Sequence, residues 1–297
     1  MLDYLIRKAR IVDGGGTPAY FADVGIEDGR IAAVAPVLRE NALHTIDAHG
    51  LVLSPGFIDS HSHDDMILEN APECRHKLEQ GVTTVITGMC GHSVAPMSER
   101  HAAEGARICA TLCAKGVNTD PETHCSFSTY LRELRDDLGP NAAFHIGHGT
   151  VRTAVMGFER RPPTTTEMEL MKSYVRDAME AGALGISFGL IYTPGCFCDT
   201  DEIIELCRVV AQYGGDMTIH MRNEGDTLVE AVEETLRVVR ETGIRCVISH
   251  HKASGGRRNW GKTALTLPLV DRINAEGYTV FLDQYPYTAS ATGLNNE

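Results

Sequence analysis

The pattern of apolar and polar residues changes once along the chain, near Pro55. Before this point, short alternating apolar runs are separated by turn sequences such as Asp13-Gly14-Gly15-Gly16 and Asp28-Gly29. Alternation with a period of two is typical of strands, and Asp-Gly between two such runs predicts a tight hairpin. We therefore expect residues 1–54 to form a small β-sandwich portion.

After Pro55, short apolar runs alternate with longer stretches in which apolar residues recur every three or four positions. The repeat is about thirty residues long, which is typical of a strand followed by a helix. Helical spacing with a glycine at the carboxyl end is clearest over residues 167–181, 201–213 and 227–241, and Thr200 is the expected cap of the second. The alternating strands are expected to end near His61, Cys90, His148, Ser187, His220, His250 and Asp283.

Consecutive strand and helix units of this kind favour a parallel sheet that closes into a TIM-like (β/α) barrel. Seven strand ends are visible, and the chain stops at Glu297 without an eighth. We therefore expect an α/β fold in which residues 55–297 form a barrel truncated after its seventh strand. A doubly wound open sheet is the alternative, but no Gly-x-Gly-x-x-Gly follows any strand.

Composition narrows the class of protein. A chain of 297 residues that is 43% hydrophobic can bury a large core. Its net charge of -13 disfavours nucleic acids and anionic membranes as partners, because these attract basic surfaces. Neither a signal peptide nor a membrane-spanning stretch is visible near Met1. The nine scattered cysteines favour reduced thiols, so a soluble cytoplasmic protein is expected.

Candidate metal ligands lie at the predicted strand ends. His61 and His63 are separated by one residue, so on a strand both imidazoles face the same side. A βα barrel gathers its strand ends at one mouth, which would bring this pair together with Cys90, His220 and His250. Core packing would instead place Val, Ile or Leu at these positions, so the five residues predict a metal centre. Imidazole and thiolate ligands suit zinc, and an open coordination position would activate water for hydrolysis.

Smaller assignments follow from strand geometry. His250 and His251 are adjacent and must face opposite ways, so we assign His250 to the metal and His251 to packing. Glycines flank Cys90 and allow its backbone to approach a ligand closely, whereas the alternative is a loop cysteine without a chemical role. For His61 and His63, the alternative is a pair of ordinary core or solvated histidines.

Five segments in order resemble the N-acyl-D-amino-acid deacylases, or D-aminoacylases, a branch of the metal-dependent amidohydrolase superfamily. They are His61-Ser62-His63-Asp64-Asp65, Gly81-Val82-Thr83-Thr84 leading into Cys90-Gly91, Gly189-Leu190-Ile191-Tyr192-Thr193-Pro194-Gly195, His220-Met221-Arg222 and Ser249-His250-His251-Lys252. The resemblance covers nearly the entire chain. It implies a barrel beside a β-sandwich built from both chain ends, whose C-terminal half would be absent here. It also implies hydrolysis of N-acyl-D-amino acids to a carboxylate and a free D-amino acid.

The resemblance assigns roles to single residues. It implies that Cys90, His220 and His250 hold one tightly bound zinc ion, and that His61 and His63 form a weaker second site with Cys90 between them. The implied substrate contacts are Tyr192, Lys252, Tyr285 and Ser290, the last two from the segment 283–290. Lys252 shares a strand face with His250 and would pair with the carboxylate of the substrate. Loop packing for Tyr192 and a solvated surface position for Lys252 are the ordinary alternatives.

The chain departs from the family in one important respect. The family's catalytic aspartate ends the eighth strand, which would lie beyond residue 297, so no catalytic residue is assigned. Asp64, Asp65 and Asp283 are nearby carboxylates, and Asp64 is expected to brace the histidine pair. We therefore expect the sequence to be part of a longer chain.

Two other functions stay open. One is a catalytically inactive metal-binding fragment or interaction protein, and the other is a cyclic amidase related to dihydroorotases or hydantoinases. Cys90 in the place of a bridging lysine argues against the cyclic amidase. Neither the oligomeric state nor the preferred acyl group and side chain is predicted.

Overall fold

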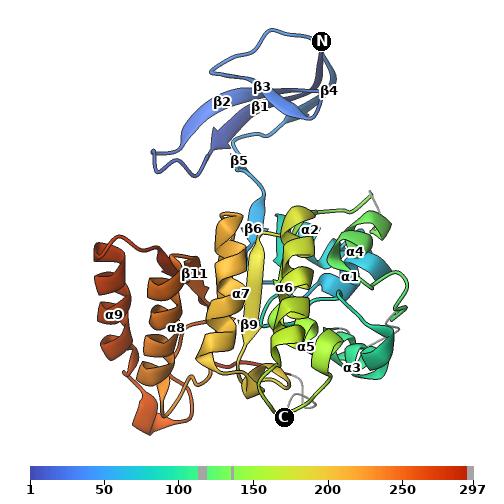
Figure 1. The fold of residues 1–297 in the computed structure, drawn as a ribbon. Coiled ribbons are helices and arrows are strands. Elements are labelled where there is room, and N and C mark those ends of the chain that lie inside the picture. The colour runs from blue at the N-terminus through green and yellow to red at the C-terminus, as the bar shows by residue number, and fades with distance from the viewer. Residues whose placement is uncertain (113–118, 135–136, 293–297) are drawn as a thin grey trace. The chain divides into compact units, whose positions relative to one another are not determined.

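Residues 1–112, 119–134 and 137–292 are described in the computed structural model of the chain, which is drawn in Figure 1. The chain divides into two compact units, Met1–Phe57 and Ile58–Glu297. Among the described residues, no helix is long and apolar enough to cross a membrane.

The first unit is built around one mixed sheet. Its strands are β1 (Leu2–Ile11), β2 (Tyr20–Glu27), β3 (Arg30–Ala35), β4 (Ala42–Asp47) and β5 (Val52–Leu53). They lie in the order β3-β2-β1-β4, with β5 also paired to β1, and β4 and β5 run parallel to β1. The predicted hairpin joins β2 to β3. Asp28 and Gly29 have φ angles of 51° and 69°, as a two-residue turn between twisted strands requires.

The second unit contains a seven-stranded sheet whose strands follow sequence order from β6 to β12. The strands are β6 (Phe57–Asp59), β7 (Val82–Thr87), β8 (Asn141–Gly147), β9 (Gly185–Gly189), β10 (Asp216–His220), β11 (Arg245–Ile248) and β12 (Val280–Leu282). The strand pairs from β7 to β12 are parallel. The sheet is a curled, incomplete TIM-like barrel, which confirms the predicted fold class.

Helices follow the strands and cover the sheet. They are α1 (Asp65–Asn70), α2 (Arg75–Leu78), α3 (Ala102–Leu112), α4 (Phe127–Glu133), α5 (His148–Met156), α6 (Thr165–Glu180), α7 (Thr200–Gln212), α8 (Leu228–Thr242) and α9 (Thr263–Ala275). Short 3-10 turns lie at Glu99–His101, Gly195–Phe197 and Arg257–Asn259. In Figure 1, α6 to α9 stand side by side in sequence order, each packed against the next.

Local signals fix where the main helices begin and end. Thr164 and Glu167 form a reciprocal capping box at the start of α6. Asp199, rather than the expected Thr200, caps α7, because its carboxylate accepts the Glu202 backbone N–H at 2.9 Å. Helix α8 ends at Gly243, whose φ of 71° is left-handed.

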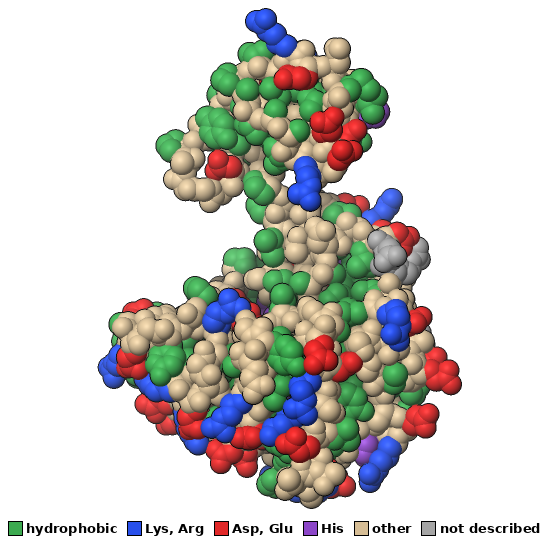
Figure 2. Space-filling model, turned by 45° about the horizontal axis from the view of Figure 1, so that its top comes forward, with side chains coloured by type: hydrophobic (Ala, Val, Ile, Leu, Met, Phe, Trp, Pro, Cys, Tyr) green, Lys and Arg blue, Asp and Glu red, His purple; other side chains and the backbone are tan. Residues whose placement is uncertain are grey.

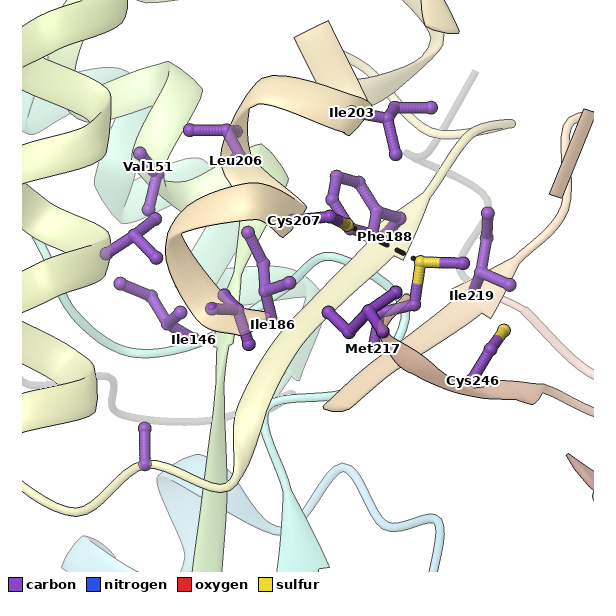
Figure 3. Packing of buried hydrophobic residues seen from close by; sticks show 14 of the residues in the cluster. Ile146, Val151, Ile186, Phe188, Ile203, Leu206, Cys207, Met217, Ile219 and Cys246 are labelled. Atoms are coloured by element: carbon purple, nitrogen blue, oxygen red, sulfur yellow. Dashed lines mark hydrogen bonds between the residues drawn. The ribbon is translucent and has the colours of Figure 1, made fainter. Parts of the chain in front are cut away.

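The core of this unit lies between the central strands and α7, as Figure 3 shows. Ile186 and Phe188 of β9 and Met217 of β10 are completely buried, and the Met217 sulfur lies 3.5 Å from Cys207 Sγ of α7. Alternation along a strand then turns the intervening residues to the opposite face. His220, the last residue of β10, therefore points into the barrel.

The outer surface of the helices is charged and mixed in sign. Figure 2 shows acidic and basic side chains interspersed on the face in view. Ion pairs join neighbouring helices, with Lys172 Nζ 2.8 Å from Glu205 Oε2 and Arg237 Nη2 2.9 Å from Asp201 Oδ1. Exposed pairs of this kind each contribute little to stability, so the buried apolar layer dominates.

A buried ionic cluster joins α5 to α7. Arg152 and His148 of α5 are completely buried, and both contact the carboxylate of Glu202 on α7. Arg152 Nη1 lies 2.8 and 2.6 Å from the two carboxylate oxygens, and His148 Nε2 lies 2.8 Å from Oε1. Burial would raise the pKa of Glu202, but the hydrogen bond from His148 and the charge of Arg152 lower it overall.

Candidate metal centre

The barrel holds a cavity of about 630 Å³ that all nine predicted site residues line. Its lining comprises His61, His63, Cys90, Ile191, Tyr192, His220, Glu224, His250, Lys252, Tyr285, Tyr287, Ala289, Ser290, Ala291 and Thr292. Most of these residues end a strand or follow it within a few positions. The parallel strands therefore bring together side chains that lie far apart in sequence, as expected for a βα barrel.

Cys90 lies at the centre of the predicted metal ligands. Its Sγ is 3.3 Å from His61 Nε2 and 3.6 Å from His250 Nε2. Burial alone would raise the pKa of this thiol, but hydrogen bonds with all four cavity histidines lower it well below its usual value. The thiol is therefore poised to act as a thiolate ligand.

The spacing of these atoms can be compared with a zinc site. A thiolate and an imidazole on one tetrahedral zinc ion lie about 3.5 Å apart. The two sulfur–nitrogen distances of Cys90 bracket this value. Ligand atoms of His61, Cys90 and His250 all lie within 4.8 Å of one another, as do those of His220, Glu224 and His250. The residues present therefore fit a zinc ion, whereas the division into tight and weak sites stays a prediction.

The loop that carries Cys90 is shaped by glycines. Cys90 has a left-handed φ of 53°, which is uncommon for a residue with a side chain. A Cβ at Gly189 would lie 1.9 Å from the Cys90 carbonyl oxygen, and one at Gly88 would lie 1.9 Å from the His145 carbonyl oxygen. Only glycine at these two positions allows the loop to cross the strand ends so closely.

Two carboxylates brace this loop and the histidines. Buried Asp65 accepts the Gly88 backbone N–H at 2.7 Å, and burial raises the pKa of Asp65 to about 6. Asp283 contacts His61 Nδ1 at 3.1 Å and also accepts the backbone N–H of His250. His250 has a φ of 39°, so the hydrogen bond that its backbone N–H donates to Asp283 holds a strained backbone in place.

The expected role of Asp64 is wrong. Its carboxylate lies 3.2 Å from His76 Nε2 and 3.1 Å from Lys77 Nζ, so its partners come from α2. Asp283, directly after β12, takes the bracing role at His61. His251 faces away from the cavity as expected, because it is buried with Nε2 2.9 Å from Thr266 Oγ1.

Glu224 is a cavity residue that the sequence did not indicate. It lies four residues after His220, in the loop before α8, and its side chain is only 10% exposed. Its Oε1 is 2.7 Å from His250 Nδ1 and its Oε2 is 2.5 Å from Lys252 Nζ. Burial would raise the pKa of Glu224, but these basic neighbours lower it overall.

The predicted substrate contacts lie beside the histidines. The Tyr192 hydroxyl is 3.4 Å from His220 Nδ1, and the Lys252 ammonium lies 5.6 Å from the centre of the Tyr285 ring. Burial raises the pKa of Tyr192 to about 12, so its hydroxyl stays protonated at neutral pH. Ser290 lines the same cavity and is exposed. The geometry therefore places one cation and several hydroxyl groups next to the metal ligands.

A second group of metal-ligating side chains, His148, Cys198 and Glu202, lies within the buried cluster between α5 and α7. Arg152 already occupies both oxygens of Glu202. A buried guanidinium beside the carboxylate would repel a metal ion. Burial also raises the pKa of Cys198 to about 12, so its thiol stays protonated. We therefore assign no metal to this group.

The chain is similar to proteins of known activity. The profile of the Amidohydrolase family matches residues 44–288. The chain is 42% identical to a D-aminoacylase of Alcaligenes xylosoxydans xylosoxydans over 297 residues, which cover 99% of this chain and 59% of that protein. It is 40% identical to an N-acyl-D-aspartate deacylase of the same organism, covering 98% of this chain and 57% of that protein.

Solved structures agree in fold. An N-acyl-D-glutamate deacylase of Bordetella bronchiseptica, complexed with zinc and a phosphonate mimic of the tetrahedral intermediate, superposes with a TM-score of 0.88 at 38% identity. A D-aminoacylase structure with a binuclear metal centre superposes with a TM-score of 0.91 at 42% identity. Each comparison covers 98% of this chain and 60% of the other chain. An L-hydantoinase of Arthrobacter aurescens, at 17% identity and a TM-score of 0.61, covers 96% of this chain and 59% of its own and shares the fold alone.

The chain thus spans about three-fifths of the length of the curated relatives it matches. Within that length, the family profile includes every residue from His61 to Asp283 discussed above. The chain therefore belongs to the amidohydrolase family, within its branch of D-aminoacylases, or N-acyl-D-amino-acid deacylases.

Proposed function

We propose that this chain carries the zinc centre and the substrate-anchoring residues of an N-acyl-D-amino-acid deacylase. The observation that carries the proposal is a low-pKa thiol surrounded by four imidazoles in a cavity that also holds Lys252. The activities named for its relatives, which include deacylases for N-acyl-D-aspartate and N-acyl-D-glutamate, support the substrate class. Because the chain spans only part of the length of these relatives, hydrolysis of N-acyl-D-amino acids by this chain itself is also a proposal.

In this proposal, Cys90, His220 and His250 hold a tightly bound zinc ion. His61 and His63 form a weaker second site together with Cys90. When bound, zinc supplies Lewis-acid activation of the amide carbonyl group and of water. Asp283 keeps the His61 ring in its orientation through the 3.1 Å contact at Nδ1.

The remaining cavity residues bind and orient the substrate. Lys252 pairs with the substrate carboxylate, which carries a full charge at neutral pH. The Tyr192 hydroxyl, next to His220, donates a hydrogen bond to a polar oxygen of the substrate. Tyr285, whose ring centre lies 5.6 Å from the Lys252 ammonium, and Ser290 line the same cavity and contact the rest of the bound amino acid. Together these groups hold the amide bond next to the metal ligands, which is an orientation effect.

One observation favours a second candidate, a metal-binding protein without turnover. Among the described residues, the two carboxylates within hydrogen-bond distance of the metal-ligand side chains are already engaged. Glu224 is paired with His250 and Lys252, and Asp283 with His61 and a backbone N–H. Neither is free to move a proton between water and the leaving nitrogen, as general acid–base catalysis requires.

An assay of the zinc-loaded chain separates the two candidates. The substrates are N-acetyl-D-amino acids with acidic and with apolar side chains, and the controls are their L enantiomers and an unsubstituted hydantoin. The proposal predicts release of the free D-amino acid and no reaction of either control. A folded chain that binds zinc but releases no D-amino acid would favour the metal-binding protein. Opening of the hydantoin ring alone would support a cyclic amidase instead.

A further inference from the structure

Glu224 lies where the loop after β10 meets the loop after β11. Its carbonyl oxygen accepts two hydrogen bonds from Ser254, at 2.7 Å from the backbone N–H and 3.1 Å from the hydroxyl. The next residues are held as well, because Asn223 Oδ1 accepts the backbone N–H of Gly225 at 2.8 Å and that of Thr227 at 3.1 Å. The backbone of Glu224 is therefore anchored independently of its side chain.

The two carboxylate oxygens of Glu224 contact two different basic groups. Oε1 lies 2.7 Å from Nδ1 of His250, while the other nitrogen of that ring faces Cys90 Sγ at 3.6 Å. Oε2 lies 2.5 Å from the Lys252 ammonium. Lys252 also donates to the His250 carbonyl oxygen at 3.1 Å, so its ammonium is held on two sides. One buried carboxylate thus links a predicted metal ligand to the predicted substrate anchor.

We propose that Glu224 is a positioning residue that sets the distance between the metal ligand His250 and the carboxylate anchor Lys252. This inference rests on the proposed function, since it assigns those roles to its two partners. Carboxylates that contact the outer nitrogen of a ligating imidazole fix the orientation of the ring, and their loss typically weakens metal binding about 10- to 100-fold. Loss of the same carboxylate also removes the charged partner of Lys252. Its ammonium would keep only its contacts with His250, so its flexible stem would be less well fixed.

The position of Glu224 explains why a single carboxylate can contact both His250 and Lys252. His250 and Lys252 both lie in the loop that follows β11, and Lys252 Nζ is 3.2 Å from His250 Nδ1, so the two side chains lie together. Glu224 approaches from the neighbouring β10 loop and meets both of them from the side. His220 Nε2 is 3.9 Å from Oε2, which is too long for a hydrogen bond, so the carboxylate contacts the two residues of the loop after β11.

The test is Glu224→Gln, measured in the purified chain by competition for zinc with a chromophoric chelator. The variant should bind the same number of zinc ions as the wild type, with a dissociation constant raised about 10- to 100-fold. Lys252→Met should leave the zinc dissociation constant within twofold of wild type. The matched control is Asp226→Asn, on the same loop, whose exposed carboxylate pairs with Arg258 at 2.5 Å and should not alter zinc binding.

Kinetics then separate this inference from the proposed function. With an N-acetyl-D-amino acid as substrate, Glu224→Gln should raise KM and weaken zinc binding together, whereas Lys252→Met should raise KM alone. The zinc-binding measurement does not depend on turnover. An inactive wild-type chain would therefore contradict the proposed deacylase function, whereas the comparison of zinc dissociation constants would still test the role of Glu224. A zinc affinity of Glu224→Gln within twofold of wild type, in a variant with a wild-type circular dichroism spectrum, would overturn the inference. Loss of one bound zinc ion would also overturn it, because Glu224 would then be a ligand.

Discussion

The buried cluster of Arg152, His148 and Glu202 makes a strong prediction about stability. Glu202→Gln keeps the size of the side chain but removes its charge. An amide has one acceptor oxygen, so it cannot accept from Arg152 and His148 as the carboxylate does, and its NH2 group would face other donors. The guanidinium of Arg152 would remain completely buried without a counter-ion.

The magnitude follows from this burial. Removing one partner of a buried ion pair costs about 3–5 kcal/mol, because the remaining charge is left uncompensated. For a unit of this size, each kcal/mol lowers the melting temperature by about 2–4 °C, so the expected decrease is roughly 6–20 °C. Asp201→Asn is the matched control. Asp201 is the neighbour of Glu202 on the first turn of α7, but it pairs with Arg237 at the surface with 77% of its side chain exposed. Its loss should cost about 1 kcal/mol at most.

The assay is thermal and urea unfolding followed by circular dichroism at several pH values. Because the pKa of Glu202 is lowered in the folded state, its stabilising contribution is present above the usual value of 4.5 and is lost as the pH falls through the folded-state pKa. The difference between wild type and variant should therefore be largest near neutral pH and shrink in acid. Equal melting temperatures for Glu202→Gln and Asp201→Asn at pH 7 would refute the reasoning.

Two further predictions concern the cavity. Lys252→Met should raise KM for N-acetyl-D-amino acids at least tenfold with little change in kcat. The reason is that the ammonium binds the substrate carboxylate equally in the ground state and in the transition state. Steady-state kinetics measure both constants, and a fall in kcat alone would count against the assignment. Gly189→Ala should displace the Cys90 loop, because the added Cβ would lie 1.9 Å from the Cys90 carbonyl oxygen. We expect a destabilisation of about 1–3 kcal/mol and weaker zinc binding, and an unchanged zinc affinity would show that the loop tolerates the shift.

Much of the barrel could be predicted from the sequence because its signals are local. Apolar runs that end in glycine or histidine mark strands such as β9 and β10, and helical spacing closed by Gly243 marks α8. The metal-ligand candidates were visible because histidine or cysteine at a strand end is an unexpected residue there. Parallel strands in sequence order then bring those ends together.

The residues that sequence reasoning missed lie off the strands. Glu224 is in a loop, and its direction depends on hydrogen bonds between its carbonyl oxygen and Ser254, thirty residues later. No periodicity signals such a contact. The one available signal was its spacing of four residues from His220, on the segment that leads into α8.

Charged residues on helices were equally hard to interpret. Glu202 lies among apolar neighbours on α7, and a charge there is most often solvated. Only the structure shows that Arg152, on α5, is completely buried and reaches Glu202 in the interior. Asp64 was misjudged for a related reason. It lies next to the histidine pair in sequence, but the side chains that its carboxylate contacts, His76 and Lys77, come from α2.

The central claim is that Cys90 and the four cavity histidines form a zinc centre. The most direct measurement is the zinc content and zinc dissociation constant of the purified chain, by mass spectrometry and chelator competition, for wild type and Cys90→Ser. Circular dichroism of both proteins shows that they are folded. We predict at least one tightly bound zinc ion per wild-type chain and loss of tight binding in the variant, because the Cys90 sulfur lies 3.3 Å from His61 Nε2 and 3.6 Å from His250 Nε2. A folded wild-type chain without bound zinc, or equal zinc affinity in Cys90→Ser, would contradict the claim.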